Sequence, residues 1–194
     1  KKELDDKVLY DFLTYNTVAT PNTMFKGIYK FKPGHYMVVT KDGIKTYESF
    51  NDLKYRKLNF ASEKELEDLV YHKLEESVRL RMISDVPVGA FLSGGVDSSA
   101  IVALMRDNTP NEIKTFTIGF ENQPHYNELK YADKISKRYN TNHFVKTVTP
   151  NDLLDFIPKI TDIYDEPQAD TTAIPIYFIS QLAKQQDIKV VLNG

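Results

Sequence analysis

The sequence predicts an α/β fold in which a parallel sheet carries helices on both faces. Two observations lead to this prediction. From Ala61 onward, short apolar stretches of strand length alternate with longer stretches in which apolar residues recur at helical spacing. The short stretches, such as Val88 to Leu92 and Ile188 to Leu192, are largely apolar, as expected of strands buried on both faces. Strands that alternate with helices in this way form parallel sheets.

The first 55 residues differ in texture and predict the end of an antiparallel β domain. A short helix comes first, and its apolar face consists of Val8, Leu9, Phe12 and Leu13. An extended stretch follows, with Asp42 and Gly43 as the turn of a hairpin. The polar and basic stretch from Asn51 to Asn59 predicts a linker. We therefore expect two domains, residues 1–55 and residues 56–194, both incomplete.

The second region starts with a helix and a strand. Ser62 and Glu65 have the spacing of a capping box, in which the two side chains satisfy free backbone amides at the start of a helix. Apolar residues follow at helical spacing, namely Leu66, Leu69, Val70, Leu74 and Val78. After the strand from Val88 to Leu92, a further helix starts near Asp97 and ends at the stretch from Asp107 to Pro110.

Two more strands with their helices lead to the last strand. Ile113 to Phe120 alternates as a strand, and Asn127 is expected to cap the helix that follows it. His143 to Val148 is the next strand, and Pro150 takes the first position of a short helix. A helix from Ala173 to Gln185 precedes the last strand.

Composition narrows the classes of function. The chain has 25 Lys and Arg against 27 Asp and Glu, so no overall charge draws it to nucleic acid or to an anionic membrane. No apolar run approaches the roughly 20 residues of a membrane-spanning helix. The chain has no cysteine, which suits a reducing compartment, and we expect a cytoplasmic protein. It begins at Lys1 instead of Met and stops directly after an apolar strand, so we expect a piece of a longer protein.

The stretch from Ser93 to Ser98, Ser-Gly-Gly-Val-Asp-Ser, lies between a strand and a helix. At this edge of an α/β sheet, loops and helix N-termini bind ligands. The two glycines let the backbone turn tightly and present its N–H groups to an anion, to which the helix N-terminus also contributes. The two serine hydroxyls add donors. Asp97 would repel a phosphate unless a divalent cation such as Mg²⁺ lies between them, so the loop predicts a phosphate site with a metal.

Other glycine-rich motifs do not fit this spacing. The Walker loop requires a lysine where Gly95 stands, and the dinucleotide-binding Gly-x-Gly-x-x-Gly is absent. A nucleophile elbow around Ser93 would require a glycine at Phe91. The remaining alternative is a plain helix N-cap after a glycine-rich turn, without a ligand.

The motif resembles the pyrophosphate loop of the ATP pyrophosphatases, which cleave ATP between its α and β phosphates. Three further stretches resemble the asparagine synthetases of this group. Phe116 to Phe120 is similar to their second strand, and Tyr164 to Gly194 to the stretch that leads into their Ser-Gly-Glu/Asp-Gly loop. Thr20 to Val39 resembles the end of the glutaminase domain that precedes their synthetase domain. One departure is Asn193, which stands where the family has serine.

The resemblance implies an adenine nucleotide α-hydrolase-like fold and a set of ATP-binding residues. Leu92 and Ile118 would contact the nucleoside through backbone groups, and Asp97 would bind Mg²⁺. Asn193 and Gly194 would begin the loop that closes over the nucleotide. The residues implied to hold the pyrophosphate are Ser93, Gly94, Gly95 and Ser98.

The resemblance also implies a reaction, in which aspartate is adenylated on its β-carboxylate and ammonia then displaces AMP to give asparagine. Glutamine would supply the ammonia through an N-terminal cysteine that this chain lacks. Catalytic residues are expected beyond residue 194, and the chain alone is expected to be inactive. A homodimer of the full-length protein is left open. Two alternatives remain: a related synthetase that acts on another carboxylate, as in β-lactam formation or peptide or sugar amidation, and an ATP-binding module without turnover.

Two acidic positions leave their roles open. Asp165 and Glu166, which precede Pro167, fit either a paired acid site or a solvated turn. Asp170 and Thr171 precede a helix and fit either a cap or the lining of an aspartate pocket.

Overall fold

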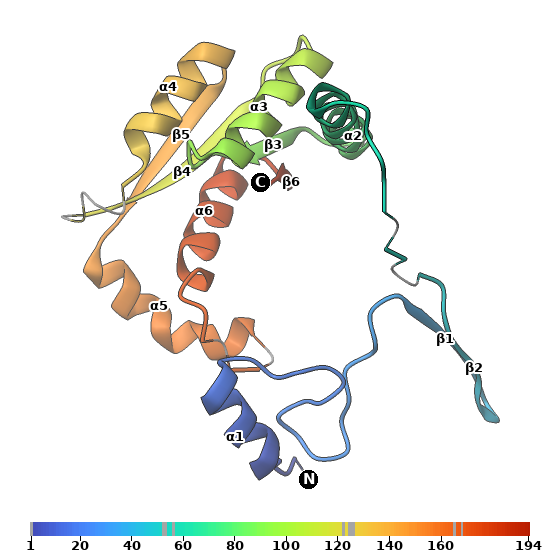
Figure 1. The fold of residues 1–194 in the computed structure, drawn as a ribbon. Helices are drawn as coiled ribbons and strands as arrows, with labels where there is room; N and C mark the ends of the chain where they lie inside the picture. The colour runs from blue at the N-terminus through green and yellow to red at the C-terminus, as the bar shows by residue number, and fades with distance from the viewer. Residues whose placement is uncertain are drawn as a thin grey trace. The chain divides into compact units, whose positions relative to one another are not determined.

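The computed structural model describes residues 2–51, 54–55, 57–121, 123, 127–164, 166–167 and 169–194. These residues divide into two compact units (Figure 1). The first unit comprises Lys1–Asn59 with Thr161–Asp170, and the second comprises Phe60–Ile160 with Thr171–Gly194. The elements are α1 (Asp6–Tyr15), β1 (His35–Thr40), β2 (Gly43–Ser49), α2 (Glu63–Arg81), β3 (Val88–Phe91), α3 (Val96–Asn108), β4 (Lys114–Phe120), α4 (Leu129–Tyr139), β5 (Asn142–Val148), α5 (Pro150–Ile163), α6 (Ala173–Gln185) and β6 (Val190–Leu192).

The second unit contains a four-stranded parallel sheet with the strand order β5-β4-β3-β6. The chain passes from β3 to β4 and β5 on one side and then returns to the other side of β3 with β6. The direction in which successive strands are added therefore reverses at β3, between its neighbours β4 and β6. In α/β sheets, the crevice at such a point, beyond the carboxyl end of the strand, is where ligands bind. The predicted phosphate loop follows β3 at this point.

Helices cover both faces of the sheet, as the sequence predicts (Figure 1). Ala90 and Leu92 face a core cluster that α2, α3 and α4 complete on one side. Phe116, which is fully buried in β4, faces the other side, where α6 contributes Ile179 and Ala183. The polar residues of β4, Thr115 and Thr117, alternate with apolar ones and are buried as well, because helices cover both faces of the sheet. The predicted α/β architecture is confirmed.

The helix α5 begins with a complete cap. The Thr149 backbone N–H donates to a carboxylate oxygen of Asp152 at 2.8 Å, and the Asp152 backbone N–H donates to the Thr149 hydroxyl at 3.2 Å. Pro150 occupies the first helical position, as expected, because it has no N–H to satisfy there. The helix extends to Ile163 and is thus longer than the predicted short helix.

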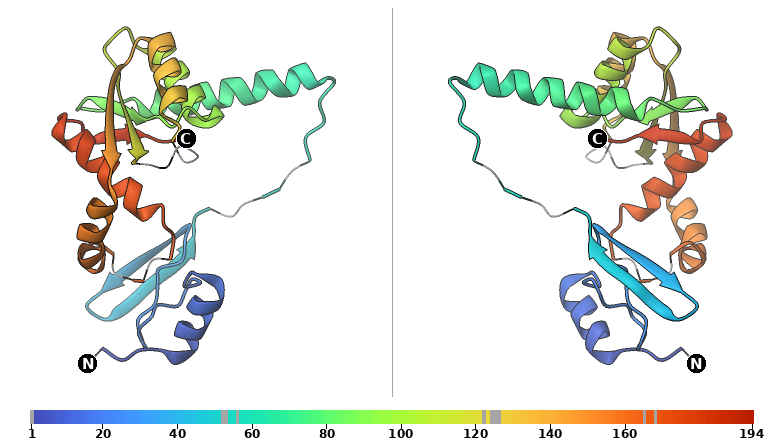
Figure 2. Two further views of the ribbon diagram at one scale, coloured as in Figure 1. Left: turned by 90° about the vertical axis from the view of Figure 1, so that its left-hand side faces the viewer. Right: turned by 90° about the vertical axis from the view of Figure 1, so that its right-hand side faces the viewer.

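The first unit consists of α1, the hairpin β1-β2 and the segment from Thr161 to Asp170 (Figure 2). Two predictions are corrected here. Leu13 is 70% exposed and does not join the small core around Val8. The hairpin ladder pairs Thr40 with Gly43, so the turn residues are Lys41 and Asp42, one position earlier than expected.

The starts of α2 and α4 give one confirmation and one correction. At α2, the Glu65 N–H donates to the Ser62 hydroxyl at 3.2 Å, and the Glu65 carboxylate accepts from the Ala61 N–H at 2.8 Å. At α4, the N-cap residue is Glu128, not Asn127. The Asn127 side chain instead bonds both backbone groups of Phe120, because the strand end has free donors and acceptors there.

None of the helices in the described part of the chain combines the length and the apolar character that crossing a bilayer requires.

Candidate functional site

The candidate site begins where β3 ends. The Leu92 N–H donates to the Phe116 carbonyl at 2.8 Å, and the Thr117 hydroxyl donates to the Leu92 carbonyl. Thr117 is buried, so this side chain serves the backbone and not the solvent. These bonds fix the exit of β3 against β4 and determine where the glycine-rich loop starts.

Gly94 is the glycine that the loop geometry requires. Its φ of +85° lies in the left-handed region, which residues with a side chain rarely adopt. A Cβ at this position would lie 2.5 Å from the Cβ of Tyr131 and 2.6 Å from the backbone nitrogen of Ala132. Gly95 has an ordinary φ of −67°, and its Cβ would meet the Ser93 hydroxyl at 3.2 Å. Close packing on α4 therefore demands glycine at the first position of the pair only.

The two serine hydroxyls of the loop contact each other. Their oxygens lie 2.9 Å apart, and the Ser98 oxygen also accepts from the Ser93 N–H at 3.3 Å. The Ser93 oxygen accepts from the Gly95 N–H at 3.2 Å. Ser98 is buried while Ser93 is exposed. Because a hydroxyl rotates freely about its bond, this pair can turn its donors toward an anion that enters the loop.

The helix α3 has no side-chain cap at its N-terminus. Its N-cap residue is Gly95, which has no side chain to accept hydrogen bonds from the first turn. These amides and the positive end of the helix dipole favour an anion at this end. Asp97 is exposed in the first turn of α3 and is not the N-cap residue, since Gly95 takes that position after the glycine-rich turn.

The end of β6 packs directly on this first turn. A Cβ on Gly194 would lie 2.6 Å from the backbone nitrogen of Ser98 and 2.7 Å from the carbonyl carbon of Asp97. The contact follows from the register, which pairs Leu192 with Ala90 in the neighbouring β3. The sheet thus brings the last residues of the chain to the loop, although about a hundred residues separate them in sequence.

A cleft of about 400 Å³ opens at this edge of the second unit. Its polar lining includes Ser93, Ser98 and Asn193, and its apolar lining comes largely from side chains of β4 and α6. This division suits a ligand that has an anionic end and a flat apolar end. The lining residues are Phe91, Leu92, Ser93, Ser98, Thr117, Ile118, Phe120, Glu128, Pro175, Ile176, Ile179, Asn193 and Gly194.

The structure brings the residues expected from the sequence to one place. Those that line the cleft are Leu92, Ser93, Ser98, Ile118, Asn193 and Gly194. Gly94, Gly95 and Asp97 belong to the adjoining loop and helix turn. Among the described residues, no group of three His, Asp or Glu side chains is placed to hold a metal ion.

The lining residues that sequence reasoning missed are Phe91, Thr117, Phe120, Glu128, Pro175, Ile176 and Ile179. A signal existed for Phe120, because it lies two residues after Ile118 on the same strand end. None existed for the residues of α6, whose contact with the cleft depends on tertiary packing. Asp170 and Thr171 are not among the lining residues, and the N-cap of α6 is Thr172.

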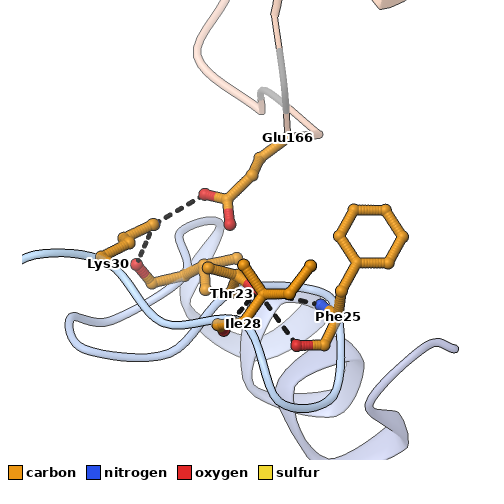
Figure 3. A network of polar contacts seen from close by, with 6 residues as sticks. Thr23, Phe25, Ile28, Lys30 and Glu166 are labelled. Carbon is orange, nitrogen blue, oxygen red and sulfur yellow. Dashed lines mark hydrogen bonds and ion pairs between the residues drawn. The ribbon is translucent and has the colours of Figure 1, made fainter. Parts of the chain in front are cut away.

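Glu166 forms an ion pair within the first unit, and Asp165 lies outside the described residues. The Lys30 ammonium lies 2.6 Å from one carboxylate oxygen of Glu166 and donates to the Val18 carbonyl at 3.0 Å (Figure 3). Thr23 supports the same loop, because its hydroxyl donates to the Ile28 carbonyl at 2.7 Å. Glu166 is therefore ion-paired with Lys30, and the paired acid site of Asp165 and Glu166 stays a prediction.

His143 is a half-buried titratable group away from the cleft. Its Nδ1 lies 2.9 Å from the Thr115 hydroxyl, and its buried Nε2 has no hydrogen-bond partner among the described residues. Burial lowers the pKa of His143 below its ordinary value, while the charge of Asp133 and the bond to Thr115 oppose this shift. The imidazole is therefore favoured in its neutral form.

Comparison with known proteins places these features in a family. The family model described as asparagine synthase matches residues 69–194. The chain is 33% identical over 195 residues to asparagine synthetase (glutamine-hydrolyzing) 1 of Bacillus subtilis (strain 168), covering 99% of this chain and 30% of that protein. It is 31% identical over 197 residues to putative asparagine synthetase (glutamine-hydrolyzing) 2 of Methanocaldococcus jannaschii, covering 100% of this chain and 37% of that protein.

Among solved structures, an NH3-dependent NAD synthetase from Campylobacter jejuni superposes with a TM-score of 0.42 and 13% identity. This match covers 62% of this chain and 53% of the other. The chain spans 30% and 37% of the length of the two curated relatives, so it corresponds to part of such a protein. The family match covers more than half of the chain and includes the loop, the cleft and the end of β6. The chain therefore belongs to the asparagine synthase family.

Proposed function

We propose that this chain forms the nucleotide site of an enzyme that amidates aspartate to asparagine at the expense of ATP. The observation that carries the proposal is the geometry around α3. An uncapped helix N-terminus, a glycine required by its positive φ and by close packing, and the end of β6 meet beside the cleft. These features suit the phosphates of a nucleotide whose base lies against the apolar lining. Family membership supports ATP as that nucleotide.

In the proposed first step, a β-carboxylate oxygen of aspartate attacks the α-phosphorus of ATP. The new O–P bond replaces the bond to the bridging oxygen, and pyrophosphate leaves with the electron pair, which gives β-aspartyl-AMP. Charge grows on the departing pyrophosphate. The first amides of α3 are oriented before the reaction, and the hydroxyls of Ser93 and Ser98 can turn toward the same place, so these groups would stabilise that charge as it develops.

In the proposed second step, the nitrogen of ammonia attacks the acyl carbon of the intermediate. The C–O bond to AMP breaks, AMP leaves with the electron pair, and the nitrogen gives up a proton to a base. The ammonia would come from glutamine, hydrolysed in the part of the protein to which residues 1–55 are proposed to belong. Because the chain has no cysteine, we expect it to release no ammonia from glutamine by itself.

Asp97 suits a Mg²⁺ ion that arrives with the nucleotide. Mg²⁺ in phosphate sites usually takes one or two carboxylates together with phosphate oxygens and water, so a single exposed carboxylate beside the phosphate loop fits this donor set. When bound, the ion supplies positive charge to the phosphate groups. The cytoplasmic location, the absence of nucleic-acid partners and a homodimer of the full-length protein remain parts of the proposal.

The test is pyrophosphate release by the full-length protein with aspartate and ammonia or glutamine. Asp97→Asn should lower the rate by about a hundredfold or more, because metal charge stabilisation is worth several kcal/mol. Its stability should change by less than about 1 kcal/mol, the usual size of a charge effect at a helix N-terminus. Asp107→Asn, at the exposed far end of α3, is the matched control and should retain activity.

A panel of acceptors decides the substrate. Pyrophosphate release with aspartate, and with no other acceptor of the panel, supports the proposal. Release only with a peptide, a sugar acid or a β-lactam precursor would replace the acceptor and keep the adenylation chemistry. ATP binding without pyrophosphate release from any carboxylate would contradict the enzymatic proposal and favour a nucleotide-binding module.

A further inference from the structure

Glu128 is the one charged residue among the described residues that line the cleft. Its carboxylate is exposed and forms no hydrogen bond or ion pair within the described part of the chain. A single carboxylate in a cleft that otherwise offers hydroxyl, amide and apolar groups is a specific acceptor for ligand donors.

The local needs of α4 do not explain a glutamate at this position. Glu128 is the N-cap residue, where Ser, Thr, Asp or Asn is preferred because a short side chain can reach back to the first amides. Its side chain makes no such bond. The preceding Asn127, which could cap, instead bonds Phe120. A residue that departs from the local preference without a structural gain is expected at a functional position.

Packing places the start of α4, where Glu128 lies, against both β4 and the phosphate loop. The next residue, Leu129, packs on Gly119 near the end of β4, where a Cβ on the glycine would lie 2.8 Å from its Cδ1. Ala132, whose N–H donates to the Glu128 carbonyl at 3.1 Å, packs on Gly94 of the phosphate loop. One turn of α4 thus touches both β4 and the phosphate loop, and Glu128 directly precedes that turn.

The part of a nucleotide between its phosphates and its base is the sugar. A ribose presents two neighbouring hydroxyl donors, and a carboxylate presents two acceptor oxygens, so the pair matches. The same use of an acidic side chain occurs in dinucleotide-binding folds, where it bonds a ribose hydroxyl. A phosphate would be repelled by this carboxylate, and the adenine edge has acceptor nitrogens beside its amino group.

We propose that Glu128 binds the ribose hydroxyls of the nucleotide and makes the site select ribonucleotides over deoxyribonucleotides. This inference rests on the proposed function, because it assumes that the cleft holds ATP. Removing one charge-assisted hydrogen bond at an exposed position should cost about tenfold in affinity.

The experiment measures the dissociation constants of ATP, 2′-deoxy-ATP and 3′-deoxy-ATP with the full-length protein by titration calorimetry. The wild type should bind ATP about tenfold more tightly than either deoxy analogue. Glu128→Ala should bind all three equally, and more weakly than the wild type binds either deoxy analogue, because the variant lacks both bonds and each analogue lacks only one. Glu128→Gln retains one acceptor oxygen and should keep part of the preference. Glu121→Gln, an exposed residue directly after β4 and outside the cleft lining, is the matched control and should keep the full preference.

The outcomes separate the two proposals. ATP binding by the wild type with an unchanged ATP preference in Glu128→Ala would overturn the role of Glu128 and leave the proposed function standing. A change in the preference for ATP over GTP, with the deoxy analogues unaffected, would assign Glu128 to the base and also overturn the inference. Failure of the wild type to bind ATP would refute the proposed function itself. Thermal unfolding of each variant excludes loss of fold as the cause.

Discussion

The backbone of Gly94 lies against Tyr131, so that a Cβ on the glycine would lie 2.5 Å from the Cβ of the tyrosine. The phosphate loop and α4 are therefore in backbone contact, with no side chain between them. This contact holds the loop in the turn that leaves the N-terminus of α3 accessible. It also links the loop to α4, whose N-cap residue is Glu128.

Gly94→Ala should disrupt this contact. The positive φ alone costs about 1 to 3 kcal/mol for a residue with a side chain, and the overlap with Tyr131 and Ala132 adds to that cost. We expect a lower midpoint of thermal unfolding and loss of ATP binding. Gly95→Ala is the control, because its φ is ordinary and its Cβ meets only a serine hydroxyl. Equal stability of the two variants would contradict the close-packing explanation.

Asn127→Asp should weaken the join between β4 and α4. The Asn127 amide accepts from the Phe120 N–H at 2.6 Å and donates to the Phe120 carbonyl at 2.8 Å. The carboxylate of an aspartate can still accept from the Phe120 N–H, but it has no N–H to donate to the Phe120 carbonyl, so two acceptors would face each other. This loss should lower the free energy of unfolding by about 1 to 3 kcal/mol. Chemical denaturation measures this cost. Asn151→Asp, exposed in the first turn of α5, should be neutral or slightly stabilising, since a carboxylate is favoured there.

The cap of α5 should make stability depend on acidity. The Thr149 N–H, followed by the Thr149 hydroxyl, lowers the pKa of Asp152 below its ordinary value of 3.8. The carboxylate form is thus favoured in the folded state, so its contribution is present above that value and is lost as the pH falls through the lowered pKa. The stability difference between wild type and Asp152→Asn should shrink over this range. A difference that stays constant down to about pH 2 would count against the cap as its source.

His143 should give a second pH dependence, in a different range. Burial lowers its pKa below 6.5, so the unfolded chain takes up a proton more readily than the folded chain. The contribution of His143 to the stability of the folded state is therefore fully present above pH 6.5, and it is lost as the pH falls from 6.5 to the lowered pKa. His143→Gln removes the titration and should flatten the decline between about pH 7 and about pH 5. Parallel curves for the two proteins would show that another group is responsible.

The sequence was sufficient for features that depend on neighbours along the chain. The alternation of strands and helices, the capping box at Ser62 and the phosphate loop all rest on local spacing. Features that depend on distant partners were not predictable. Leu13 has helical spacing like that of Val8 and yet lies in solvent. Asn127 has the residue type of a cap, but the free backbone of Phe120 competes for its side chain.

The same distinction applies to the site. Ser93, Ser98 and the glycine pair were found because one continuous motif contains them. The part of the apolar lining that comes from α6 was missed, because Pro175 and Ile176 reach the cleft only through the packing of α6 on the sheet. Glu128 carries no motif at all, and its place in the cleft becomes visible only when α4 is seen against Gly94 and Gly119.

The ion pair between Lys30 and Glu166 bears on how relatives of this protein could exchange parts. The first unit is discontinuous, since it takes in Thr161–Asp170 as well as Lys1–Asn59. A chimaera joined only at the linker after Asn59 would inherit Lys30 from one parent and its carboxylate partner from the other. Natural or engineered recombination at that joint should therefore succeed most often when the second segment, around Glu166, is exchanged with the first.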